Sequence, residues 1–248
     1  MLRRPRTRTL VGLDIEPGSL AAAQVVTAGG LRVARGATAP LEPHVVRDGE
    51  VADVEGLAEA LRGLWREHKG LGKRVRLGVA NARIVVRALD APPLEDEREL
   101  AAAVRFQAQD ELPMPLDAAV LDFQPLGLVE TPNGPRRRVM LVAARREMVE
   151  RFLTAAREAG LRPEGIDLSA FALARALHER GTGPALLLTV GGLTNLAIVD
   201  DDGACLFTRV AGGGLEALAA ELAARQAVTL EEARAALPRA AAAAVRTA

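Results

Sequence analysis

The sequence predicts a mixed α/β protein built from two related halves. Short apolar segments of strand type alternate with segments whose apolar residues recur at helical spacing. In addition, one layout occurs twice, in residues 11–37 and again in residues 187–211. Each copy has an apolar strand, a glycine-containing turn, a second strand, a polar turn and a third strand. A repeat of this kind favours a duplicated fold over a single undivided domain.

The first half begins with the first of these three-stranded segments. Strands are predicted at residues 9–15, 20–27 and 31–36, followed by a loop marked by Pro40, Pro43 and Gly49. Val54, Leu57, Leu61 and Leu64 recur at helical spacing, and glycines at 70 and 72 end that helix. Two further strands are predicted at 74–80 and 84–88, with a turn around Asn81.

The middle of the chain alternates helices and strands. An acidic helix start follows Pro92 and Pro93, and this helix stops at Pro113. Strands are predicted at 119–129 and 138–144, then a helix that Gly160 ends and a brief strand at 166–168. Ser169 is the expected N-cap of the helix that follows.

The second three-stranded segment is predicted at 185–190, 194–199 and 204–210. A helix over 215–224 comes next, and Thr229 with Glu232 has the pattern of a capping box for a last short helix. Pro238 is expected to stop that helix and to leave residues 238–248 as a disordered tail.

Composition excludes several classes of function. The chain has 32 Lys and Arg residues and 32 Asp and Glu residues, so it has no net charge that would attract nucleic acid. No apolar run reaches the roughly 20 residues of a membrane span. The single cysteine, Cys205, rules out a disulfide framework and fits a reducing cytoplasm. The three histidines lack the spacing of metal ligands, so no metal site is predicted.

The turns of the two three-stranded segments are candidate anion sites. Backbone N–H groups in glycine-containing turns can point at phosphate oxygens, and a carboxylate beside them can hold Mg²⁺ through water. The alternative is that these turns are ordinary hairpins and that the last glycines form a flexible connection to a helix. The candidate nucleotide-binding residues are Gly12, Asp14, Gly18, Ser19, Gly191, Gly192, Thr194, Gly213 and Gly214.

Several segments resemble the PilM family of type IV pilus assembly proteins. Residues 11–15 (VGLDI) resemble its first phosphate-loop strand, and residues 105–117 with 120–123 resemble its inserted subdomain. Segments 142–145, 159–163, 167–173, 207–209, 213–214 and 230–233 continue in the family's order.

This resemblance implies an actin-like (ribonuclease H-like) duplicated α/β fold with an inserted α+β subdomain and an incomplete second half. The expected division is a first core over 1–43 and 124–183, an insert over 44–123, a partial second half over 184–237 and the tail 238–248.

The phosphate loops depart from the family's pattern. Glu16 and Pro17 replace a glycine and a serine, Ala21 replaces a lysine, and Thr189 replaces an aspartate. A carboxylate repels phosphate and proline lacks a donor N–H, so loss of nucleotide hydrolysis is expected, with no cofactor bound. The alternative is an actin-fold ATPase that still binds ATP and Mg²⁺.

The resemblance implies a cytoplasmic scaffold at the inner face of the cell membrane. Its expected partners are the short cytoplasmic tail of a PilN-like bitopic membrane protein and other pilus assembly proteins. The tail is expected to lie in a groove between the first core and the insert, with Phe106, Leu112, Pro113 and Met114 as candidate lining residues. The alternative for Phe106 is a place in the protein core. A non-functional remnant of a longer gene is a further alternative for the whole chain.

Overall fold

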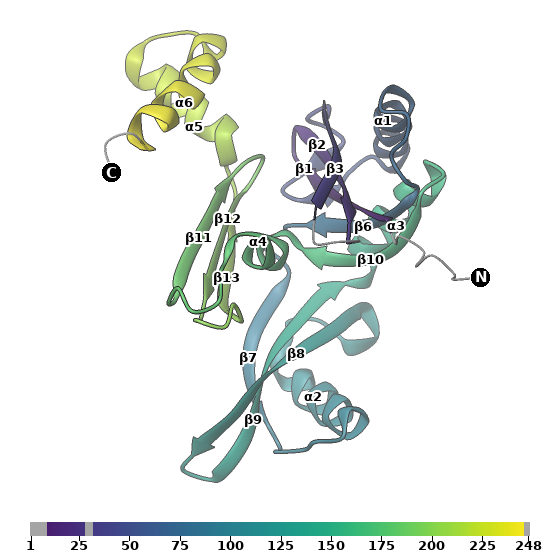
Figure 1. Cartoon of the computed structure of the whole chain (residues 1–248), viewed down its shortest axis with the longest axis vertical. Helices are drawn as coiled ribbons and strands as arrows, with labels where there is room; N and C mark the ends of the chain where they lie inside the picture. Colours follow the sequence, from purple (N-terminus) through teal and green to yellow (C-terminus); the bar gives the residue numbers. More distant parts are fainter. Residues whose placement is uncertain (1–8, 28–31, 246–248) are drawn as a thin grey trace, which may run out of the picture.

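The computed structural model describes the backbone of residues 9–27 and 32–245 and side chains up to residue 237. The chain forms three parts: a first core, an inserted sheet with its own helix, and a second half with a smaller sheet (Figure 1). The element sequence follows the predicted alternation of strands and helices closely.

The first core is a five-stranded sheet in the order β10-β6-β1-β2-β3. Its strands are β1 (Thr9–Glu16), β2 (Ser19–Val26), β3 (Arg32–Pro40), β6 (Arg74–Val79) and β10 (Arg162–Leu168). A small hairpin of β4 (Val46–Arg47) and β5 (Glu50–Val51) lies before α1 (Val54–Glu67), and α3 is Arg146–Glu158.

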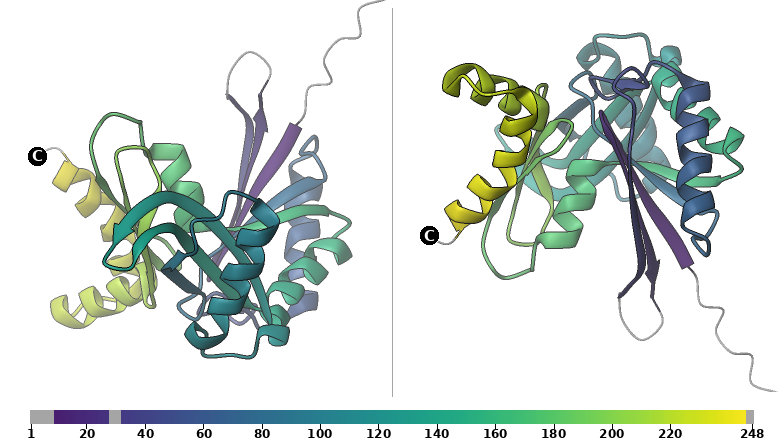
Figure 2. Two further views of the ribbon diagram at one scale, coloured as in Figure 1. Left: turned by 90° about the horizontal axis from the view of Figure 1, so that it is seen from below. Right: turned by 90° about the horizontal axis from the view of Figure 1, so that it is seen from above.

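Helices α1 and α3 cover one face of this sheet, as the views in Figure 2 show for α1. Val11, Leu13 and Ile15 alternate along β1 toward that face, where fully buried Leu61 and Phe152 meet them. Because side chains alternate along a strand, Gly12, Asp14 and Glu16 lie on the opposite face. The alternation therefore places these three residues in the space between the two halves.

The insert is a three-stranded antiparallel sheet, β7-β9-β8, with one helix packed against it. Its elements are β7 (Val85–Ala91), α2 (Glu97–Glu111), the short 3-10 helix Leu116–Ala118, β8 (Ala119–Thr131) and β9 (Gly134–Arg145).

The boundaries of the insert differ from the expected 44–123. Strand β6 pairs in parallel with β1, with Leu77 opposite Leu13, and parallel neighbours need a crossover connection, which α1 supplies. Residues up to Val79 therefore belong to the first core, and the separate sheet spans β7 to β9.

The second half repeats the meander of the first. Strands β11 (Ala185–Val190), β12 (Thr194–Val199) and β13 (Cys205–Ala211) form an antiparallel sheet in sequence order, like β1, β2 and β3. Helix α4 (Ser169–Leu177) packs on it through Ala170, with Ala197 and the buried Cys205.

Helices α5 (Gly214–Gln226) and α6 (Leu230–Val245) extend away from this sheet (Figure 1). The predicted capping box is present, because the Glu232 carboxylate accepts the Thr229 N–H at 2.8 Å and the Thr229 hydroxyl accepts the Glu232 N–H at 3.2 Å. The predicted stop at Pro238 is wrong, since α6 continues to Val245 through an alanine run of high helix propensity. Of the expected disordered tail, residues 246–248 lie outside the described residues.

Candidate functional site

The β1–β2 hairpin and α4 build one wall of the candidate site. Gly18 occupies the hairpin turn with φ of 85°, a conformation that favours glycine, and Ser19 is exposed beside it. Asp14 comes from the open face of β1 and accepts a hydrogen bond of 2.8 Å from the Ser169 hydroxyl. Burial raises the pKa of Asp14 above its ordinary value of 3.8, and the Ser169 hydrogen bond opposes this shift.

The role expected for Ser169 is corrected by this contact. Leu168, not Ser169, is the N-cap residue of α4, and its side chain makes no capping hydrogen bond. Ser169 is the first helical residue, and its hydroxyl serves Asp14 instead. Gly78 leaves room for this pair, because a Cβ atom at Gly78 would lie 2.9 Å from Asp14 Oδ1.

The turns at the starts of the two halves pack directly on each other. Oε2 of Glu16 accepts the backbone N–H of Gly192 at 2.8 Å, and Oε1 accepts from Nδ2 of Asn195 at 3.4 Å. A Cβ atom at Gly191 would lie 2.1 Å from Glu16 Oε2, and one at Gly192 would lie 2.1 Å from the Pro17 carbonyl oxygen. Glycine is required at both positions for this approach.

Three effects set the pKa of Glu16. Burial is the largest and raises the pKa above the ordinary 4.5, the hydrogen bond from the Gly192 N–H lowers it, and the nearby Asp14 charge raises it. The Gly192 amide, one of the predicted phosphate donors, is thus already bonded to a carboxylate of the protein itself.

The Gly212-Gly213-Gly214 run leads into α5, as predicted. The start of this helix packs on the turn that contains Gly191 and Gly192. Gly213 is its N-cap with φ of 96°, and the Leu215 N–H donates to the Gly191 carbonyl oxygen at 2.7 Å. A Cβ atom at Gly214 would lie 2.1 Å from that oxygen. The Leu215 N–H at the start of α5 is therefore already hydrogen-bonded within the protein.

A cleft of about 1030 Å³ lies between the two halves. Of the predicted nucleotide-binding residues, Gly12, Asp14 and Gly191 line it, together with Glu16 and Thr189. The other six, Gly18, Ser19, Gly192, Thr194, Gly213 and Gly214, lie outside its lining. The remaining wall is mostly small and apolar, and includes Ala21, Ala23, Val25, Ala172 and Leu173.

A second cavity of about 690 Å³ lies between the first core and the insert, and we call it the core–insert groove. Val120, Asp122 and Gln124 of β8 and Val142 of β9 line its insert side. Arg76, Asp167 and Arg175 line its core side, where Arg175 donates a hydrogen bond to Asp167. The groove therefore combines an apolar wall with charges of both signs.

The four predicted groove residues lie elsewhere in the insert. Phe106 is 71% exposed on α2, so it is neither a core residue nor part of the groove lining. Leu112 and Met114 pack into the insert's own core between α2 and its sheet, and Pro113 is exposed. Helical spacing identified an amphipathic helix but not which neighbour its faces meet.

Asn195, which is 1% exposed and contacts Glu16, is not among the residues predicted from the sequence. A polar side chain inside the apolar strand 194–199 was the available signal.

The part of the chain that the structure describes contains no cluster of three or more His, Cys, Asp or Glu side chains able to hold a metal ion. Among the same residues, no helix combines the length and apolarity of a membrane span.

Two meandering sheets that face each other across a cleft, with a sheet inserted into the first, define an actin-like protein. Solved structures agree: this chain superposes with a TM-score of 0.78 on a chain of the "PilM-PilN type IV pilus biogenesis complex", at 29% identity. That match covers 93% of this chain and 69% of the other.

A family model described as "Type IV pilus assembly protein PilM" matches residues 12–240. The chain therefore belongs to the PilM family of type IV pilus assembly proteins. It is also similar in fold to the ethanolamine utilization protein EutJ from Carboxydothermus hydrogenoformans, with 19% identity and a TM-score of 0.52. That match covers 94% of this chain and 61% of EutJ.

Proposed function

We propose that this protein is a cytoplasmic scaffold of type IV pilus assembly that binds the cytoplasmic tail of a PilN-like membrane protein. Family membership and the likeness to a chain of a PilM-PilN complex support this partner. Binding to the tail would hold the protein at the inner face of the cell membrane, where other pilus assembly proteins would join it.

The observation that carries the proposal is the core–insert groove. Its volume of about 690 Å³ is within the usual range of binding pockets, and its lining by strands of two sheets suits an extended peptide. Val120 and Val142 offer contacts to apolar side chains of the tail. The charged side chains of Arg76 and Asp122, which also line the groove, would fix the direction and register of the peptide.

We further propose that the protein does not hydrolyse nucleotide. The Glu16 carboxylate bonds the Gly192 N–H at 2.8 Å, so a phosphate oxygen would have to displace it and tolerate its charge. Thr189, in the cleft, offers no carboxylate for a metal ion or for an attacking water molecule. The competing proposal, an ATP-binding actin-fold protein, rests on the size of the cleft beside Asp14.

A peptide titration tests the scaffold proposal. The probe is a synthetic peptide of the cytoplasmic tail of the PilN protein from the same genome, measured by calorimetry. We expect wild-type protein to bind it without nucleotide, and Val142→Lys to weaken binding at least tenfold by placing a charge in the groove. Leu128→Lys, at a 60% exposed position on the same sheet, is the matched control. Absence of binding to wild-type protein would contradict the proposal.

A further inference from the structure

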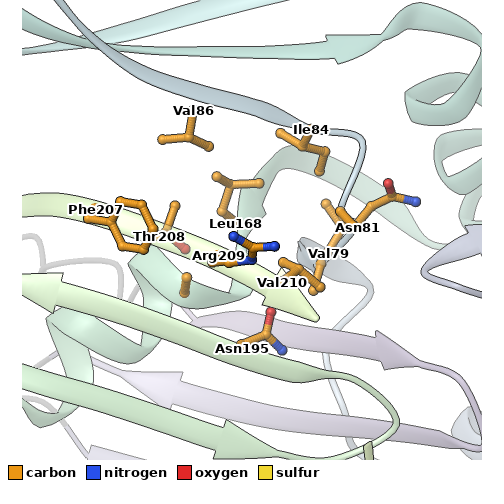
Figure 3. A pocket seen from close by; sticks show the side chains of 13 residues that line it. Val79, Asn81, Ile84, Val86, Leu168, Asn195, Phe207, Thr208, Arg209 and Val210 are labelled. Carbon is orange, nitrogen blue, oxygen red and sulfur yellow. The ribbon is translucent and has the colours of Figure 1, made fainter. Parts of the chain in front are cut away.

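A third cavity, of about 280 Å³, lies where the first core, the insert and the second half meet, and we call it the edge cavity. Figure 3 shows Ile84 and Val86 on one side and the residues from Phe207 to Val210 on the other. Leu168, just before α4, lies between the two sides. Ile84 and Leu168 also line the core–insert groove, whereas Val86 and the residues from Phe207 to Val210 line neither the groove nor the cleft.

Two unpaired strand edges border this cavity. Strand β7 is the end strand of the order β7-β9-β8, and β13 is the end strand of β11-β12-β13. No backbone hydrogen bond joins β7 to β13 among the residues that the structure describes. An open strand edge presents free N–H and C=O groups at the spacing of an extended chain. The cavity thus offers main-chain partners to an extended peptide.

Asn195 adds a specific acceptor at the base of the cavity. Its side chain is 1% exposed, and Oδ1 has no hydrogen-bond partner. Nδ2 donates to Glu16, and this contact fixes the amide, since the reversed orientation would oppose an oxygen to a carboxylate. Figure 3 shows the oxygen pointing toward Val210. A buried amide oxygen without a donor is costly, and it is the feature that a donor from a ligand would satisfy.

The edge cavity adjoins the core–insert groove. Val79, Ile84 and Leu168 line both. A peptide that follows the groove past these three side chains would reach the open edge of β13. Arg209, exposed on the rim and without an ion pair among the described residues, would favour an acidic side chain in that part of the peptide.

We propose that the edge cavity receives the continuation of the bound tail, which lies as an extended strand beside β13 and donates a hydrogen bond to Asn195 Oδ1. This inference rests on the proposed function and extends its site into the second half. The tail would then contact all three parts of the protein. Its binding would hold the second half against the insert, through the same Asn195 side chain that contacts Glu16.

Two variants test the inference with the same PilN tail peptide. Asn195→Val removes the acceptor, and we expect affinity to fall five- to tenfold, the range for a lost buried hydrogen bond. Val86→Phe fills the cavity from β7 while leaving Asn195 in place, and we expect a loss of at least tenfold. Val33→Phe, at a 63% exposed position on β3, makes the same change away from the cavity and should bind like wild type.

The outcomes separate this inference from the function on which it rests. Weakening by Val142→Lys together with unchanged affinity in Asn195→Val and Val86→Phe would overturn the inference and keep the groove. Failure of the wild type to bind any tail peptide would overturn both. If Asn195→Val unfolds, Val86→Phe decides, and its melting temperature shows whether it remains folded. Chemical-shift changes in Phe207, Thr208 and Arg209 on addition of the peptide would support the placement beside β13.

Discussion

The Ser169 hydroxyl donates a hydrogen bond of 2.8 Å to Oδ1 of Asp14, although the two residues are 155 positions apart in the chain. The bond joins the open face of β1 to the first turn of α4, the helix that leads from the first half into the second. It therefore connects the floor of the cleft to the element that positions the second sheet.

Removal of this hydroxyl should destabilise the protein. Ser169→Ala leaves Asp14 Oδ1 without its donor in a largely desolvated position, so we expect the free energy of unfolding at pH 7 to fall by about 1–3 kcal/mol. Urea titration followed by circular dichroism measures the difference. Ser19→Ala, which changes an exposed serine in the β1–β2 turn, is the control and should have little effect. Equal stability of Ser169→Ala and wild type would show that the bond contributes nothing.

The raised pKa values of Asp14 and Glu16 predict a pH dependence of stability with a definite sign. A carboxyl whose pKa is higher in the folded state keeps its proton there while the unfolded chain has released it. Their contribution to stability is therefore largest below the ordinary values of 3.8 and 4.5 and is lost as pH rises through the raised values.

Asp14→Asn tests this sign. Asparagine keeps an oxygen that can accept from Ser169 but carries no charge, so the variant should gain stability relative to wild type as pH rises from acid to neutral. Unfolding titrations across that range measure the gain, with Asp110→Asn on the exposed side of α2 as the control. A gain that shrinks toward neutral pH would refute the expected burial cost of the Asp14 charge.

The sequence predicted the order and type of most elements because apolar periodicity and turn residues are local signals. Short apolar runs at 9–15 and 185–190, each followed by a glycine-containing turn, identified the first strands of both halves, and the repeat between them predicted the duplicated fold. The actin-like class and the family were also identified correctly from the order of the motifs. The boundary of the insert was not identified correctly, because the pairing of β6 with β1 is a long-range contact that leaves no local pattern in the sequence.

The sequence predicted several residues of the site but not the hydrogen bonds that these residues make. Glu16 was recognised as a carboxylate in a phosphate-type turn, but its bond to the Gly192 N–H depends on how the two halves approach. Ser169 was assigned to a helix cap by its position, whereas its partner is distant in sequence. Phe106 was placed in a groove or a core, and helical spacing alone does not say that its side of α2 faces solvent.

Nucleotide binding should depend on Glu16. We expect calorimetry with Mg·ATP to show no micromolar binding to wild-type protein, because the Glu16 carboxylate occupies the Gly192 amide. Glu16→Gly removes the like charge and frees this donor, so binding should become stronger, and Glu16→Gln is the variant that removes charge alone. Micromolar affinity of the wild type, abolished by Asp14→Ala, would establish the competing nucleotide-dependent function.

Two phenylalanines should respond in opposite ways to truncation. Phe152 on α3 is fully buried, and Phe152→Ala should lower the free energy of unfolding by about 3–5 kcal/mol. Phe106→Ala should change it by less than about 0.5 kcal/mol, because the ring is 71% exposed. Tail-peptide affinity should also be unchanged in Phe106→Ala. Loss of affinity at unchanged stability would instead place the partner on α2.

The outer face of the second sheet should promote self-association. Leu186, Ile198 and Phe207 lie side by side across β11, β12 and β13, and they are 64%, 37% and 48% exposed. Leu188, 56% exposed, extends this apolar row along β11, and contiguous exposed apolar surface of this kind favours contact between molecules. Sedimentation velocity over a concentration series should show a rising average mass for wild type and a constant monomer mass for the Leu186→Lys, Leu188→Lys double variant. Leu128→Lys places the same charge at a 60% exposed leucine of the insert and should associate like wild type. A wild-type mass that stays monomeric at every concentration would show that this face does not drive association of the protein with itself.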